Sequence, residues 1–206
     1  FHVGEKTVGN YRIEATNPGG HSSIPIRDNA IYELSDALVK LREFEFPVML
    51  NDTTRAYFSR LGAGRADEMG KAMLAVVANP QDKAAVAMLD KDRMYHSMLR
   101  TTCVATQLDG GHANNALPQR AGALINCRIF PGVGYEEVRK TLEQVIADPR
   151  MTVTKVDDRG PIAVPPPLTK EMLEPVEKLV AKYYPGVPLV PMMSTGATDG
   201  IYFGAI

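Results

Sequence analysis

The chain alternates between two hydrophobic patterns. Four segments alternate apolar and polar side chains, which is typical of strands with one buried face. They are Thr7–Thr16, Thr101–Asp109, Arg120–Phe130 and Met151–Val156. Two other segments, Ala30–Leu41 and Val138–Ile146, repeat apolar residues at helical spacing. This order of strands and helices predicts an α+β fold of the split β-α-β, ferredoxin-like type, in which a four-stranded antiparallel sheet carries two helices on one face.

A segment of different character, about residues 52–100, separates the first helix from the second strand. It is rich in Ala, Met and Leu and is interrupted by glycines and by Asn79-Pro80. This pattern predicts a helical insertion of three or four short helices, at about Thr53–Leu61, Ala66–Ala78, Gln81–Leu89 and Lys91–Leu99. The apolar stripes Met73/Leu74/Val77 and Val86/Leu89 fit either a cofactor pocket or packing against each other or a partner subunit, and packing is the commoner use. We expect His96, near a helix end, to be structural.

The last part of the chain is predicted to form a separate segment. Residues 157–168 are rich in proline, which is typical of a linker. The pattern then predicts a helix over Lys170–Tyr184, a buried strand over Val187–Met193 and a helix from about Ile201. Pro175 is unfavourable within a helix and is expected to delay its start. We therefore divide the chain into residues 1–157 and residues 158–206.

Composition and charge argue against some classes of binding partner. The 206 residues carry a formal net charge of −1, with acidic and basic residues interspersed. This balance shows no excess of positive charge that would indicate binding to nucleic acid or to an anionic membrane. No apolar run is long enough to span a bilayer. The sequence begins at Phe1 and stops at Ile206 within a predicted helix. We interpret it as a fragment of a longer protein, whose compartment, cytoplasmic or periplasmic, stays open.

The two cysteines, Cys103 and Cys127, lie on neighbouring predicted strands, so a bridge between them has to be considered. When Val104 and Leu108 are aligned with the Ile125/Ile129 face of the strand Arg120–Phe130, the two cysteines fall on opposite faces of the sheet. This register favours two free, half-buried thiols.

The first of three polar loops is Asn17–Pro25, which connects a strand to a helix. Its Pro-Gly-Gly sequence allows backbone conformations that are closed to most residues. His21 follows on a tight turn and is therefore placed to reach out of its own domain. The alternative is that His21 only bonds a backbone carbonyl within the turn. Asp28 is the predicted N-cap of the helix that follows.

The other candidate groups are the loop Gly110–Pro118, the turn Ser194–Gly200 and Arg128. The turn follows a strand and precedes a helix, so its backbone N–H groups suit a carboxylate or phosphate, although Thr198 or Asp199 would equally serve as a plain helix N-cap. Arg128 on a strand face suits either a substrate carboxylate or a solvated sheet surface.

The sequence encodes no evident reaction centre of its own. Its four histidines, including His112, show no spacing typical of metal ligands. There is also no phosphate-binding Walker loop and no Gly-X-Ser-X-Gly nucleophile motif. We therefore predict no metal site in this chain.

Four ordered motifs resemble the lid-domain signature of the M20 metallopeptidases, which include carboxypeptidase G, succinyl-diaminopimelate desuccinylase, acetylornithine deacetylase, aminoacylase and bacterial dipeptidases. The motifs are Asn17–Pro25 with Asp28–Ala30, Gly110–Pro118, Asn126–Gly132 and Gly196–Gly200. Together they cover nearly the whole chain.

The resemblance implies a two-domain hydrolase that forms a homodimer through its lid. An α/β zinc-exopeptidase domain would carry two zinc ions, and a split β-α-β lid would be inserted into it. The family's metal ligands and general-base Glu would lie outside this chain, which would hold the lid and a returning helix-strand-helix piece of the catalytic domain. The parent would cleave peptide or N-acyl amino-acid amide bonds, whereas this chain alone would bind no zinc and be inactive.

The resemblance also assigns roles to individual residues of the lid. His21 matches the histidine that crosses the dimer interface, polarises the scissile carbonyl and stabilises the tetrahedral oxyanion. Asn114 and Asn115 match the asparagine pair that helps to hold the substrate.

A second group of matches implies carboxylate binding. Arg128 matches a lid arginine that binds a substrate carboxylate, and Gly196, Ala197 and Thr198 match the loop that holds the C-terminal carboxylate. Ala197 replaces a hydroxyl residue of the desuccinylases, which argues against that substrate. His112 and the long helical insertion also differ from the small-lid members.

An alternative from another class is a free-standing ferredoxin-like module for regulation or oligomerisation that binds a small carboxylate. The encoding DNA discriminates the two, because the hydrolase requires upstream His-X-Asp and Glu-Glu codons in the same frame.

Overall fold

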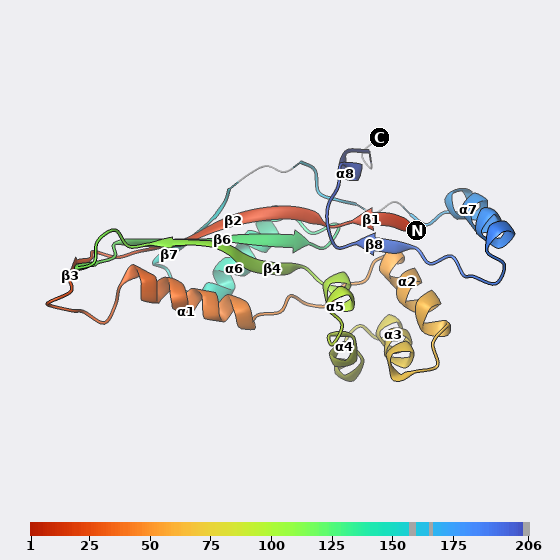
Figure 1. Ribbon diagram of the computed structural model, residues 1–206, viewed down its shortest axis with the longest axis horizontal. Helices are drawn as coiled ribbons and strands as arrows, with labels where there is room; N and C mark the ends of the chain where they lie inside the picture. Colours follow the sequence, from red (N-terminus) through yellow and green to blue (C-terminus); the bar gives the residue numbers. More distant parts are fainter. Residues whose placement is uncertain (157–159, 165–166, 204–206) are drawn as a thin grey trace.

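The computed structural model describes residues 1–156, 160–164 and 167–203 (Figure 1). Its main body is a four-stranded antiparallel sheet with the order β4-β6-β2-β7. The strands are β2 (Thr7–Thr16), β4 (Thr102–Gly110), β6 (Arg120–Ile129) and β7 (Met151–Lys155). The predicted α+β fold is confirmed, and each of these four strands is found within one or two residues of its expected bounds.

Helices α1 (Ala30–Glu43) and α6 (Tyr135–Ile146) pack on one face of this sheet and on each other. The buried side chains between them follow the alternation of the strands and the helical spacing of the helices. They include Tyr11 and Ile13 of β2, Ala123 and Ile125 of β6, Leu34 and Ala37 of α1, and Val138 and Leu142 of α6. The other face, called the open face below, carries half-buried polar residues such as Arg12 and Glu14.

The N-cap of α1 is Asn29, so the prediction of Asp28 is wrong. The Asn29 side chain accepts hydrogen bonds from the N–H groups of Ile31 at 3.0 Å and Tyr32 at 3.2 Å. Either residue type can cap a helix, and the cap falls to the one that directly precedes the first helical residue. That position is set by the complete burial of Ala30 against the sheet.

The insertion consists of four helices, as predicted. They are α2 (Asp52–Ala63), α3 (Glu68–Ala78), α4 (Lys83–Leu89) and α5 (Arg93–Leu99). Each begins after a side chain that accepts a hydrogen bond from the first turn; these caps are Asn51, Asp67, Asp82 and Asp92. Met73 and Leu89 are fully buried in the common core, which confirms that the apolar stripes serve internal packing.

The two cysteines form a disulfide, which corrects the expectation of free thiols. Cys103 lies directly opposite Cys127 across β4 and β6, with the Cα atoms 4.1 Å apart. The predicted register was wrong because β4 contains a bulge between Ala105 and Gln107. An extra residue in one strand reverses the side-chain alternation beyond it, so Leu108 does not report the face on which Cys103 lies.

A second, two-stranded sheet lies at one end of the main sheet. It pairs β1 (His2–Glu5) in parallel with β8 (Met192–Ser194). The strand predicted over Val187–Met193 is therefore too long at its start, because only Met192–Ser194 form a strand paired with β1. The pattern analysis did not predict β1, since a four-residue strand offers too few positions for a period to show.

The returning segment also contains α7 (Lys170–Tyr183) and α8 (Gly200–Phe203). Helix α7 starts where predicted and includes Pro175, so this proline does not delay it. Thr169 caps the first turn, where its hydroxyl accepts a hydrogen bond from the Met172 N–H at 3.3 Å. Residues 157–159 and 165–166 of the predicted linker lie outside the described residues. Residues 204–206, which belong to the predicted last helix, also lie outside them. No helix in the described part of the chain has the length and apolar character that crossing a membrane requires.

The insertion connects the main sheet to the returning segment. Helix α2 packs against β8, and Met193 of β8 belongs to the same buried cluster as the sheet core. Arg60 of α2 donates a hydrogen bond to the carbonyl of Leu189 at 2.7 Å and pairs with Glu177 of α7 at 3.1 Å. The two parts of the chain therefore share one continuous core.

Candidate functional site

The first two predicted polar loops meet at one end of the main sheet. Short strands β3 (Gly20–His21) and β5 (Ala116–Leu117) pair with each other, and the Ser22 N–H donates to the Asn115 carbonyl at 2.9 Å. Figure 1 shows this pair beyond the end of the main sheet, away from the insertion. Residues distant in sequence thus form one group, called the His21 cluster: His21, Ser23, Asn114 and Asn115.

The backbone of this cluster needs glycine at position 19. Gly19 has φ +78°, and a Cβ built there would lie 2.5 Å from Cγ of Gln119. Gln119 in turn donates a hydrogen bond from Nε2 to the Pro18 carbonyl at 2.9 Å. The glycine predicted to allow an unusual turn therefore also allows a close approach between the two loops.

The ring of His21 is exposed and makes its contacts within the cluster. Its Nδ1 accepts a hydrogen bond from the Ser23 N–H at 3.2 Å and lies 2.7 Å from Ser23 Oγ. Its Nε2 lies 3.3 Å from the side-chain nitrogen of Asn115. Within the described part of the chain, neither ring nitrogen bonds a backbone carbonyl. Such a bond was the alternative that the sequence left open. Asn114 is exposed beside Asn115.

Arg128 lies near the opposite end of β6, on the open face. It shares this half-buried face with Leu124 and Asn126, as predicted, and Asn126 donates from Nδ2 to Asn10 Oδ1 at 2.7 Å. Arg128 itself has no hydrogen-bond or ion-pair partner among the residues that the structure describes. A half-buried guanidinium without a partner suits an external carboxylate.

The predicted anion-binding turn adjoins the same end of the sheet. The Lys6 N–H donates to the carbonyls of Ser194 at 3.2 Å and Gly196 at 3.1 Å. The Glu5 carboxylate accepts hydrogen bonds from the Thr198 N–H at 2.6 Å and from its hydroxyl at 2.7 Å. The Gly196 N–H donates to Ser194 Oγ at 3.2 Å, so among the described residues two of the three backbone donors of the turn have internal acceptors and the Ala197 N–H is left for an external carboxylate. Arg128, Gly196, Ala197 and Thr198 are called the Arg128 cluster below.

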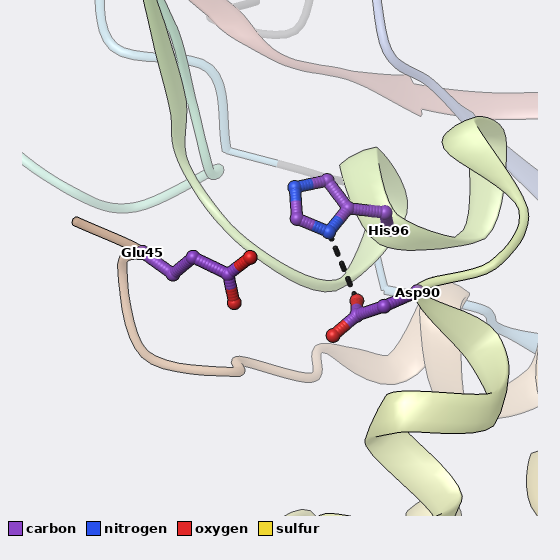
Figure 2. Close-up of side chains that lie close together, drawn as sticks. All are labelled: Glu45, Asp90 and His96. Atoms are coloured by element: carbon purple, nitrogen blue, oxygen red, sulfur yellow. Dashed lines mark hydrogen bonds and ion pairs between the residues drawn. The ribbon is translucent and has the colours of Figure 1, made fainter. Parts of the chain in front are cut away.

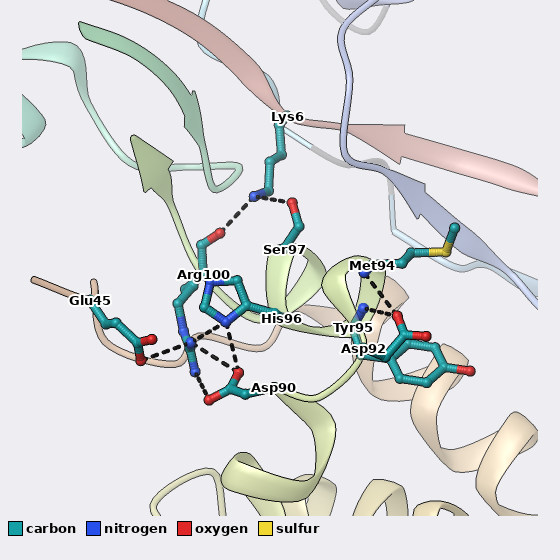
Figure 3. A network of polar contacts seen from close by, with 9 residues as sticks. All are labelled: Lys6, Glu45, Asp90, Asp92, Met94, Tyr95, His96, Ser97 and Arg100. Atoms are coloured by element: carbon teal, nitrogen blue, oxygen red, sulfur yellow. Dashed lines mark hydrogen bonds and ion pairs between the residues drawn. The ribbon is translucent and has the colours of Figure 1, made fainter. Parts of the chain in front are cut away.

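Lys6 is a buried charge that the sequence analysis did not identify. Its ammonium donates to the Arg100 carbonyl at 2.7 Å and to Ser97 Oγ at 3.3 Å, at the end of α5 (Figure 3). Burial, followed by the charges of Arg128 and Arg100, lowers the pKa of Lys6 to about 7. The sequence around a lysine that directly precedes a strand does not show whether its side chain is buried or faces solvent.

The His21 cluster and the Arg128 cluster lie far apart within one chain. Gln119, beside the His21 loop, precedes β6, and Arg128 lies near its far end. Eight residues of extended chain from Arg120 to Arg128 span about 27 Å. The structure therefore brings His21, Asn114 and Asn115 together, but it does not bring them to Arg128.

A third group of titratable side chains lies between the insertion and α1. Ligand atoms of Glu45, Asp90 and His96 all lie within 4.8 Å of one another (Figure 2). The guanidinium of Arg100, which is 2% exposed, occupies the middle of this group. Its Nη1 lies 3.1 Å from Glu45, 3.0 Å from Asp90 and 2.7 Å from His96 Nδ1 (Figure 3).

This arrangement does not fit a metal centre. A metal ion among these ligands would stand next to the buried Arg100 guanidinium, which already neutralises the carboxylates. We interpret the group as an ion network that fastens the insertion to the residues after α1, which agrees with the structural role expected for His96.

Comparisons with known proteins give one consistent family. The family model of the M20 peptidase dimerisation domain matches residues 3–151. Human N-fatty-acyl-amino acid synthase/hydrolase PM20D1 is 25% identical over 206 residues, which cover 98% of this chain and 40% of the human protein. The probable carboxypeptidase S-like 2 of Dictyostelium discoideum is 26% identical over 96% of this chain and 37% of its own length. The chain thus spans about 40% of these relatives.

Solved structures show the same fold at low sequence identity. The M20 family metallo-carboxypeptidase Sso-CP2 from Sulfolobus solfataricus matches 97% of this chain and 55% of its own chain, with a TM-score of 0.56 and 15% identity. Human carnosine dipeptidase 1 matches 95% of this chain and 45% of its own chain, with a TM-score of 0.53 and 11% identity.

Proposed function

Because the chain belongs to the M20 peptidase dimerisation-domain family, we propose that it is the lid and dimerisation part of a hydrolase for peptide or N-acyl amino-acid amide bonds. One observation carries this proposal: the His21 cluster and the Arg128 cluster lie at opposite ends of one sheet. Groups that act on one substrate must lie within a few ångströms of it. A single chain therefore offers two incomplete halves of a site.

Two copies of the chain complete both halves. In the proposed homodimer, His21 of one copy lies beside the Arg128 cluster of the other copy. A dimer with twofold symmetry makes two such composite sites.

The edge strand β4 and helix α1 form the proposed dimer surface. Strand β4 has β6 as its neighbour on one side only, and it exposes Val104 and Leu108 by 61% and 69%. Ile31 and Tyr32 of α1 are also exposed, and Ile31 contacts the end of β4 at Gly110. An exposed edge with apolar side chains is a ready surface for pairing with a second strand.

The residues divide the chemistry between them. The imidazole of His21 would donate a hydrogen bond to the scissile carbonyl oxygen and to the oxyanion that forms from it, a contribution worth several kcal/mol in a site closed to water. Arg128 and the turn Gly196–Thr198 would bind the substrate carboxylate. An amide bond beside a free carboxylate is also the chemistry that the names of the carboxypeptidase and N-fatty-acyl-amino acid relatives describe.

The zinc expected in the parent would be held by residues outside this chain. When bound, such ions activate a water molecule for attack on the amide carbonyl. Among the residues described here the Glu45 group does not fit a metal, so we assign no zinc chemistry to them, and we expect the chain alone to be inactive. We propose residues 1–157 as the lid and residues 158–206 as the returning segment of the catalytic domain. Strand β1, at the start of the proposed lid, pairs with β8 of the returning segment.

The first test is His21→Ala in the full-length parent, which should lower kcat about a hundredfold or more, because an oxyanion donor is removed. Metal content should stay unchanged. His112→Ala is the matched control, since His112 is exposed on the neighbouring loop. A loss of bound metal in His21→Ala, or unaltered kcat, would contradict the proposed role.

The second test asks whether the site is shared between chains. His21→Ala subunits and Arg128→Met subunits should each be inactive, whereas a mixed and reassembled sample should recover about a quarter of wild-type activity, since half of its dimers carry one intact composite site. If mixing restores nothing although heterodimers form, His21 and Arg128 do not act in one shared site.

A further inference from the structure

Two hydrogen-bonding groups of Ser23 converge on one ring nitrogen of His21. The Ser23 N–H donates to Nδ1 at 3.2 Å, and Ser23 Oγ lies 2.7 Å from the same atom. A backbone N–H can only donate, so Nδ1 must present its lone pair. The proton of the neutral imidazole then sits on Nε2, because the partner of one ring nitrogen sets the protonation of the other.

We propose that Ser23 is a positioning residue, which holds His21 in the Nε2–H tautomer and fixes the direction of that N–H. The opposite tautomer would place an Nδ1–H against the Ser23 N–H, so that two donors face each other at 3.2 Å. The hydroxyl adds a second donor to the same lone pair and orients the ring. The consequence for catalysis rests on the proposed function, whereas the tautomer itself does not.

Asn115 is the complementary partner on the other side of the ring. Its side-chain nitrogen is placed 3.3 Å from Nε2, which carries the proton in this assignment, so the assignment requires the amide to be turned about its last bond. An N–H donor requires an acceptor, so the amide oxygen of Asn115 is the matching atom, and the oxygen and nitrogen of an amide are assigned by such a network. A substrate carbonyl oxygen would take the same place, which leaves the His21 ring unchanged on binding.

Ser22 provides a matched control on the same turn. Its N–H donates to the Asn115 carbonyl, but no hydrogen bond of its hydroxyl is found in the described part of the chain. The turn itself is closed by the Ile24 N–H, which donates to the His21 carbonyl at 3.0 Å. Removing either hydroxyl therefore leaves the backbone contacts of the turn in place, and only Ser23→Ala removes a contact of the ring.

The tautomer is tested by nitrogen-15 NMR of the imidazole rings in this chain, at a pH where they are neutral. His21 is assigned by the loss of its signals in His21→Gln. We expect an unprotonated Nδ1 and a protonated Nε2 in the wild type and in Ser22→Ala. Ser23→Ala keeps the backbone N–H as the one donor to Nδ1, so we expect a partial shift toward the other tautomer, with recovery in Ser23→Thr. A proton on Nδ1 in the wild type overturns the tautomer, whereas no change in Ser23→Ala, or an equal change in Ser22→Ala, overturns the role of the Ser23 hydroxyl.

The catalytic consequence is tested in the full-length parent. Ser23→Ala should lower kcat about three- to tenfold with unchanged KM, the effect of losing one neutral hydrogen bond, and Ser23→Thr should restore it. Full kcat in Ser23→Ala, where His21→Ala is inactive, overturns the positioning role. Full kcat in His21→Ala instead overturns the proposed function, while the NMR result still decides the tautomer.

Discussion

Lys6 lies at the junction between the two sheets, and its replacement by methionine tests how the buried ammonium affects stability. The side chain is fully buried, its Nζ donates to the Arg100 carbonyl and to Ser97, and its pKa is lowered to about 7. Burial is the main cause, since it penalises the charged form. Methionine fills a similar volume without a charge, so the variant removes the titration.

The pKa shift fixes the sign and size of the effect. Between pH 7 and about 10.5 the unfolded chain holds the Lys6 proton more often than the folded one, so the free energy of unfolding rises with pH in this window. Below pH 7 the amine is protonated in both states and contributes no slope. Each pH unit in this window corresponds to about 1.4 kcal/mol. From pH 7 to about pH 9.5 the free energy of unfolding of the wild type should therefore rise by about 3 kcal/mol relative to that of Lys6→Met.

Chemical denaturation followed by circular dichroism measures this difference at several pH values. The other titrating groups are common to both proteins and cancel in the difference. Lys71→Met serves as the control, because Lys71 is exposed on α3 and pairs only with Glu68 at the surface; its stability curve should run parallel to that of the wild type. If Lys6→Met also runs parallel to the wild type between pH 7 and 9.5, the ammonium is not buried as described.

Three further predictions concern stability. Replacing Cys103 and Cys127 together by alanine should lower the free energy of unfolding by about 3 kcal/mol, because the bridge closes a loop with a sequence separation of 24; equal denaturation midpoints for variant and wild type would argue against the bridge. Phe58→Ala, at a fully buried ring, should cost about 3–5 kcal/mol in chemical denaturation, and a cost below 1 kcal/mol would mean that the insertion core is loose. Gly19→Ala should cost about 1–2 kcal/mol and shift the His21 ring resonances, because its φ of +78° disfavours a Cβ; unshifted resonances would show that the loop tolerates a side chain.

Patterns with a clear period predicted most of the fold. The alternation of β2 and β6 and the helical spacing of α1 reflect local geometry, in which each side chain must point toward the core or toward water. The four insertion helices were found from their content of Ala, Met and Leu and from the breaks between them, but the caps Asp67, Asp82 and Asp92 lie within the predicted ranges, so three starts were predicted two residues too early. The predicted cap of α1 was wrong by one residue, because two adjacent residues could both serve and packing chose between them.

The residues of the candidate site were predicted from local sequence, but their arrangement in space was not. The loops bearing His21 and Asn115 were identified from sequence, and so was the strand face of Arg128. That the first two meet, while Arg128 lies about 27 Å away along an extended strand, depends on which strands pair and in what register.

The sequence by itself therefore determined the elements of this protein, its family motifs and the residue types available for chemistry. Only the tertiary structure decided which of them are neighbours: the bridge between Cys103 and Cys127, the burial of Lys6, and the two donors of Ser23 at His21. The physical reason is that periodicity and capping act over a few residues, whereas a bulge, a strand register or a buried charge is fixed by contacts between segments distant in the chain.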